Sequence, residues 1–360
     1  MKRILSILLL LTLMLAAAVP ASAHPNSLAS SKITFENKRM VVSLLVDQPS
    51  VLELDKVDLK VKSSYTEEEL TYVMKEKLFA YIQKGFVVKN NGEPMAVEME
   101  NVSLAAGNNL QVDLVYSSEQ LIDKVDLEYN LFFENSNTHK NVATIESGET
   151  SSEFIFAEKS RTLGMEAGLE VPFLTAVKQF IILGVEHILT GYDHLMFLFA
   201  LVLLGGTFKN MLKIITSFTV AHSITLILAA LDIIVLPGRL VDIVVAASIL
   251  YVAIENFVVK NTNYRWVLTF VFGLVHGFGF AGALAETQIP KNHFVSSLLT
   301  FNIGVELGHI MVVAVLLPII LYVKRFDWNR LFVYGMSSVV GLFGLLWLVE
   351  RVFDLSYMPM

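Results

Sequence analysis

Hydrophobic and polar positions alternate along the first half of this chain and merge into long apolar runs in the second half. From Ser31 to about Phe156 the pattern is mostly period two, which predicts strands with one buried face. Asn91-Gly92 separates two such runs and is typical of a two-residue hairpin turn. We therefore expect a β-sandwich, with strands in residues 32–46, where two strands flank a turn, and in 86–99, 109–116, 124–133 and 152–157.

One segment departs from the alternation. Residues 66–86 begin with acidic side chains, carry apolar residues three and four positions apart, and close on Gly85. These features predict one helix on the surface of the sandwich. Residues 161–171 have no clear period, and we expect them to form a linker.

From Pro172 onward the apolar runs are too long for ordinary globular elements. About 20 residues are needed to cross roughly 30 Å of hydrocarbon, and the segments that meet this length are 184–206, 212–231, 240–258, 266–285, 294–321 and 331–350. A continuous helix over 172–206 would be over 50 Å long at about 1.5 Å per residue. We therefore expect a break at Gly184 or Gly191 in an α-helical bundle of about six spans.

The positions of lysine and arginine favour six spans with both ends outside. Lys178 then lies at the outer surface, and only Arg239, Lys291 and Arg351 lie in the outer loops and tail. The remaining basic residues near the spans lie inside, namely Lys209, Lys213, Lys260, Arg265, Lys324, Arg325 and Arg330. This distribution obeys the positive-inside rule, whereas a seventh span before Gly191 would reverse it.

Composition also indicates a protein partly in lipid, since 54% of residues are hydrophobic and 17% are charged. Residues 1–23 have a basic start, an apolar run and Ala21-Ser22-Ala23, which predict a secretory signal peptide. We expect residues 24–160 to form an extracytoplasmic domain and residues 172–360 a multi-pass domain in the cell membrane. The exported part has more acidic than basic residues, which argues against nucleic acid as a partner. The chain has no cysteine, so no disulfide or thiolate ligand forms.

Ionisable side chains are unusually frequent inside the predicted spans. Each costs on the order of 3 kcal/mol to insert at the bilayer centre, so a set of them indicates function. The set comprises His187, His194, His222, His276, His309, Glu186, Asp193, Glu255 and Glu306. The simpler interpretation is that such histidines hydrogen-bond between helices and hold the bundle together.

The spacing and the chemistry of these residues predict a metal site. His187 and His194 lie seven positions apart and share a face if the helix is continuous between them, and Asn302, Glu306 and His309 line another face at steps of four and three. Imidazole and carboxylate together suit nickel, cobalt or zinc. Neighbouring carboxylates can orient a ligating histidine. Gly273 and Gly277 should let another helix approach His276 closely.

The second half of the chain resembles the HupE/UreJ family over roughly residues 175–350. The family motif H-x5-D-H matches His187 through Asp193-His194 completely. A second motif, F-H-G-x-[AV]-x-E, is matched in part: His276-Gly277 is kept, Val275 replaces the phenylalanine, and the nearest acid that follows, Glu286, is displaced. The resemblance implies nickel or cobalt transport, and the exported domain is typical of a longer variant of the family.

We expect a metal permease. In this hypothesis His187 and Asp193 accept a divalent ion, and His194, His222, His276 and Glu306 or His309 hold it at mid-membrane. The supporting residues are Glu186, Glu255, Asn256 and Asn302, with Glu255 toward the cytoplasmic exit. One alternative is an intramembrane metal-dependent hydrolase or peptidase built from the same residues. Another is a membrane anchor that presents the β domain to a protein partner.

Overall fold

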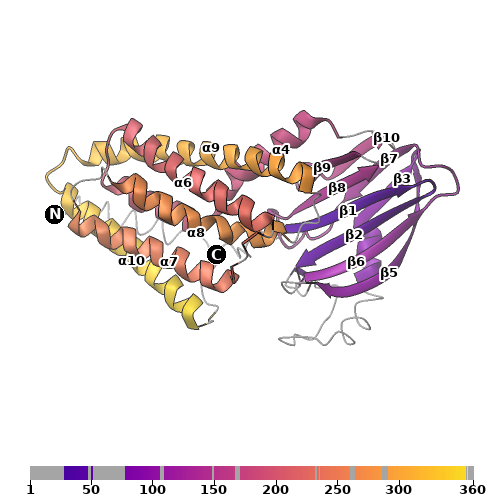
Figure 1. Cartoon of the computed structure of the whole chain (residues 1–360), viewed down its shortest axis with the longest axis horizontal. Helices are drawn as coiled ribbons and strands as arrows, with labels where there is room; N and C mark the ends of the chain where they lie inside the picture. The colour runs from indigo at the N-terminus through magenta and orange to yellow at the C-terminus, as the bar shows by residue number, and fades with distance from the viewer. Residues whose placement is uncertain are drawn as a thin grey trace.

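The computed structural model describes a β domain followed by a bundle of helices (Figure 1). The described residues are 28–47, 50–51, 78–105, 109–147, 150–166, 171–231, 233–234, 236–259, 264–285, 291–353 and 355, with no side chains described for 280–285 and 291–295. The predicted signal peptide, residues 1–23, lies outside the described residues, as does Lys260.

Two sheets pack face to face in the β domain, as the alternating pattern predicts. The larger sheet has the order β5 (Ala96–Ala105), β6 (Asn109–Ser117), β2 (Arg39–Asp47), β1 (Leu28–Glu36), β8 (Lys140–Ser147) and β9 (Thr150–Ala157). The smaller sheet has the order β10 (Thr162–Glu166), β7 (Lys124–Tyr129), β3 (Phe86–Asn90) and β4 (Glu93–Pro94). Neighbouring strands are antiparallel except β1 and β8, which are parallel.

The predicted turns and helix are found where the described residues cover them. Asn37 follows β1 with φ 49°, and Asn91 and Gly92 connect β3 to β4 with φ 52° and 84°. These left-handed conformations suit asparagine and glycine. Residues 78–85 of the predicted helix are helical, with Leu78 and Ile82 fully buried in the sandwich core. Residues 66–77 lie outside the described residues.

Two strands were not predicted from the sequence. In β8, Asn141, Val142 and Thr144 are all buried, because the sandwich core covers one face of the strand and the helices cover the other. A strand buried on both faces loses the alternation that identifies it. β10 occupies residues 162–166 of the predicted linker and pairs with β7, so the connection to the helices is shorter than expected.

Seven helices follow the sandwich in the described residues: α4 (Phe173–Thr190), α5 (Tyr192–Leu203), α6 (Phe208–Ala230), α7 (Gly238–Val258), α8 (Arg265–Ala285), α9 (Lys291–Val323) and α10 (Asn329–Phe353). By length and composition five of them can cross a membrane, namely α4, α6, α7, α9 and α10. Two shorter apolar helices accompany them, Tyr192–Leu203 and Arg265–Gly279. Many large apolar side chains point outward from the bundle, including Val220, Ile254, Val271, Ile303 and Val315.

The first predicted span is divided and starts earlier than expected. The helix begins at Phe173 rather than at residue 184, and it breaks at Gly191, where the backbone is extended. α4 and α5 together run alongside α9 in the same direction. Gly184 lies against Phe301, and at the other end the Lys324 ammonium donates a hydrogen bond to the Leu204 carbonyl. α4 and α5 thus form one kinked element, and the helices long and apolar enough to cross a membrane remain the five named above.

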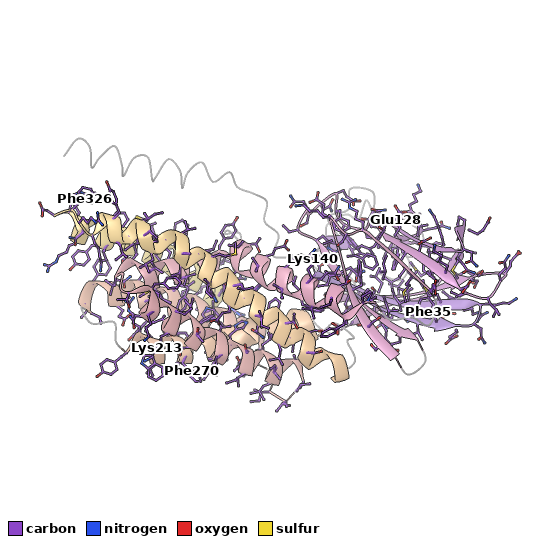
Figure 2. All side chains as sticks on the ribbon, turned by 90° about the horizontal axis from the view of Figure 1, so that it is seen from above. Phe35, Glu128, Lys140, Lys213, Phe270 and Phe326 are labelled. Carbon is purple, nitrogen blue, oxygen red and sulfur yellow. The ribbon has the colours of Figure 1, made fainter. Side chains whose placement is uncertain are left out.

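The β domain contacts the start of this crossing. The side-chain amide of Gln179 in α4 bonds both the N–H and the carbonyl of Ile155 in β9, at 2.9 and 3.0 Å. Phe180 packs with Val142 and Ile155 in one apolar cluster. Figure 2 shows Lys140 where the two parts meet, and Phe326 at the far end of the helices. α4 therefore connects the β domain to the rest of the helices.

Candidate metal centre

The first two histidines of the predicted set lie on either side of the break at Gly191. The Gly191 N–H still bonds the His187 carbonyl at 3.0 Å, so the chain kinks without unwinding further. A Cβ at Gly191 would lie 2.8 Å from that carbonyl and 3.0 Å from His194 Nδ1. The kink brings the His187 and His194 rings to a centroid distance of 4.7 Å.

Two further histidines reach this point from the packed pair α6 and α8. Gly273 and Gly277 let the helices approach so closely that a Cβ at Gly277 would lie 2.4 Å from the His222 carbonyl. The His222 ring is 6.4 Å from both His187 and His194, and the His276 ring is 5.6 Å from His194. We call these four residues the histidine cluster. The close approach predicted for His276 is confirmed.

Hydrogen bonds select the tautomer of two rings in the histidine cluster. Asp193 Oδ1 lies 2.9 Å from His194 Nδ1, and the Phe272 carbonyl lies 2.9 Å from His276 Nδ1. Both acceptors require Nδ1 to carry the proton, which leaves Nε2 with its lone pair. The Nε2 atoms of His194 and His276 are buried and make no hydrogen bond to any described residue. Both ring nitrogens of His222 are also buried and make no hydrogen bond to a described residue.

The spacing of the rings suits a shared ion. An imidazole nitrogen binds zinc at about 2.0–2.1 Å, so two rings on one ion have centroids roughly 4.5–6.5 Å apart. The four distances in the histidine cluster fall within this interval. As the side chains stand, however, no group of three or more His, Asp or Glu in the described part of the chain is arranged to hold a metal ion. Binding would therefore require ring rotation.

His309, Glu306 and Asn302 lie on α9, beside the cluster rather than within it. The His309 ring is 5.5 Å from Phe218, whose ring is also 5.0 Å from His276 and 6.0 Å from His222. Glu306 accepts a hydrogen bond from the Thr216 hydroxyl at 2.5 Å. The Asn302 amide donates to the Leu298 carbonyl at 2.8 Å, and its buried oxygen has no hydrogen bond within the described residues.

The remaining candidates interact with other residues. Glu186 is paired with Lys140 of the β domain at 2.5 Å. Glu255 is paired with Arg265 at 2.8 Å, and Arg265 also donates to Asn256 at 2.6 Å. Arg265 is eleven residues from His276 along α8, about 16 Å in a helix, so this network belongs to the other end of the bundle. The sequence placed Arg265 among the loop charges, but it is almost fully buried.

The fold and the histidine cluster define a multi-pass helical membrane protein joined to a β-sandwich. The chain belongs to the HupE/UreJ family: the family described as HupE / UreJ protein matches residues 165–351. The match covers the helices through most of α10 and only the end of the β domain. This family is linked to nickel and cobalt uptake. A comparison with curated proteins finds no match.

Proposed function

We propose that this protein is a permease that takes up a divalent transition metal, nickel or cobalt, through the histidine cluster. The observation that carries the proposal is the pair of buried Nε2 atoms on His194 and His276, whose opposite ring nitrogens are already bonded. If a histidine served only to hold helices together, its buried nitrogens would form hydrogen bonds to neighbouring helices. Membership of the family supports the same conclusion.

We further propose that the β domain lies outside the cell. In the described residues Lys209, Lys213, Lys324, Arg325 and Arg330 lie at or near the helix ends opposite the β domain, and such basic ends stay in the cytoplasm. The ion would then meet His187 and Asp193 before His194, His222 and His276. His309 and Glu306 would receive it from the cluster, with Asn302 as a supporting residue. Glu255 and Asn256 would close the cytoplasmic end, and Glu186 would hold the outer end to the β domain.

Replacing His194 or His222 tests this proposal. In cells supplied with radiolabelled nickel, His194→Ala and His222→Ala should each reduce uptake by at least about tenfold, since each removes a ligand. Ser223→Ala is the matched control, because Ser223 lies beside His222 and, among the described residues, its hydroxyl donates only to the Thr219 carbonyl of its own helix. Elemental analysis of the purified proteins should show bound nickel in the wild type and the control, and little in the two variants.

Two results would overturn the proposal. Unchanged uptake in both histidine variants would remove the histidine cluster from the transport route. Nickel-dependent hydrolysis of a peptide or lipid by the purified protein, lost with His194→Ala while uptake persists, would replace transport by catalysis.

A further inference from the structure

A cleft lies where the β domain meets the helices, separate from the histidine cluster. It has a volume of about 80 Å³ and lies between β9, the start of α4 and α9. Its apolar wall includes Phe173, Val177 and Phe180. Its polar lining consists of Ser151, Ser152, Glu153, Ser296, Ser297 and Thr300. The cleft is thus lined by one carboxylate and several hydroxyl groups.

Glu153 is the unusual member of this lining. Only 4% of its surface is exposed. The Ser297 hydroxyl donates a hydrogen bond to Oε2, whereas Oε1 is buried and has no hydrogen-bond partner in the described part of the chain. Burying a carboxylate without a counter-charge is costly. Burial raises the pKa of Glu153 to about 7, against the lowering effect of the Ser297 hydrogen bond, so the group still ionises near neutral pH.

The nearby described cations have other partners or are exposed to solvent. Lys32 is paired with Glu146 at 3.0 Å, and Lys140 with Glu186 at 2.5 Å. Lys178 is exposed on α4. Thus a buried acid with an unused oxygen lines a cavity large enough for a small ion and water.

The cleft and the histidine cluster are adjacent along the same pair of helices. Ser297 precedes Phe301 by one turn of α9, and the Phe301 ring lies 5.5 Å from the His187 ring. α9 has 33 residues, about 50 Å, which exceeds the roughly 30 Å of hydrocarbon. Its first turns can therefore project with the β domain beyond the lipid. An ion in the cleft would lie on the β-domain side of His187, which follows the cleft residue Phe180 by two turns of α4, about 10 Å.

We propose that this cleft is a second cation site, in which Glu153 and the surrounding hydroxyl groups receive a partly hydrated divalent cation before it moves to His187. The inference rests on the proposed transport function. Oxygen ligands bind nickel and cobalt more weakly than imidazole does, so the ion would move inward toward the histidines. Among the described residues that line the cleft, Glu153 is the one that carries a charge when it ionises, and its attraction would raise the local concentration of the ion.

The substitution Glu153→Gln tests the site, because it keeps the shape and the oxygen that accepts from Ser297 but removes the charge. We expect the nickel concentration for half-maximal uptake to rise about five- to tenfold, with the maximal rate within about twofold of wild type. Glu153→Asp keeps the charge, so its nickel concentration for half-maximal uptake should be close to that of the wild type. Glu146→Gln is the matched control, since it removes a charge from the neighbouring strand β8 outside the cleft.

Several outcomes would overturn the site. The site is wrong if Glu153→Gln and the wild type need the same nickel concentration for half-maximal uptake. It is also wrong if Glu146→Gln raises that concentration as much as Glu153→Gln does. If His194→Ala abolishes uptake while Glu153→Gln has no effect, the receiving site fails and the transport proposal stands. If neither variant has an effect, the transport proposal fails as well. Nickel titration of purified His194→Ala protein provides a second measurement: a weak site should remain there and be lost on adding Glu153→Gln, and its persistence would contradict the assignment.

Discussion

The four rings of the histidine cluster differ in how they are held. His194 and His276 each have one nitrogen fixed by an acceptor from their own helix, Asp193 and the Phe272 carbonyl. His222 is completely buried, and neither of its nitrogens bonds a described residue. The cluster therefore combines two rings whose tautomer is set by a hydrogen bond with one whose nitrogens make no hydrogen bond to a described residue.

Asp193→Asn tests whether the hydrogen bond that sets the tautomer of His194 is needed for metal binding. The amide can turn its NH₂ group toward His194, which would reverse the tautomer and place the proton on Nε2. We expect nickel affinity, measured by titration of the purified protein, to fall about 10- to 100-fold while the protein stays folded. Ser223→Ala again serves as the control, because the Ser223 hydroxyl donates to the Thr219 carbonyl of its own helix. An unchanged affinity in Asp193→Asn would show that the carboxylate does not orient the ring for binding.

At the scale of elements, the site depends on how closely two helices approach. α6 carries His222 and α8 carries His276, and the small residues Gly273 and Gly277 form their contact. A Cβ at Gly277 would lie 2.4 Å from the His222 carbonyl oxygen and 2.9 Å from the Leu226 nitrogen, and contacts this short with backbone atoms are relieved by displacement of the helices. Packing and ligand geometry are therefore coupled at this position.

Gly277→Ala should separate the helices and weaken both stability and uptake. Overpacking of this kind costs about 1–3 kcal/mol, and the shift would move His276 away from His194. Thermal unfolding of the purified protein, followed by circular dichroism, measures the first effect, and nickel uptake measures the second. Gly335→Ala on α10 is the control, because a Cβ there meets no atom within 4 Å and alanine favours a helix. If Gly277→Ala and Gly335→Ala had the same unfolding temperature and the same nickel uptake, close packing at Gly277 would not determine the site.

The sequence predicts those elements whose patterns are local. A break at Gly184 or Gly191 follows from helix length against bilayer thickness, and the structure has it at Gly191; the turn at Asn91-Gly92 follows from residue type. β8 was missed because α4, distant in sequence, covers its outer face. For the site, the sequence names His187, His194, His222 and His276, but the first two meet through the kink at Gly191 and not on one continuous helix face. It gives no sign that Glu186 would be paired with Lys140, or Glu255 with Arg265, because both contacts depend on packing between distant segments.

At the scale of the whole molecule, the β domain and the helices are joined through α4 and α9. Gln179 and Phe180 hold α4 to β9, while His187 on the same helix belongs to the histidine cluster. Glu153 connects the β domain to α9 through Ser297. The side of the membrane that carries the β domain therefore also decides which side supplies the proposed cation site.

Cysteine labelling can determine that side, because the chain contains no cysteine of its own. Glu119 is exposed in the β domain, and Asp327 is exposed in the turn between α9 and α10 at the opposite end of the helices. In intact cells a membrane-impermeant maleimide should label Glu119→Cys and should reach Asp327→Cys only after the cells are opened. Basic residues near Asp327, including Lys324 and Arg325, favour this orientation. The reverse labelling pattern would put the Glu153 cleft in the cytoplasm, and a cation passing from that cleft to the histidines would then be exported rather than taken up.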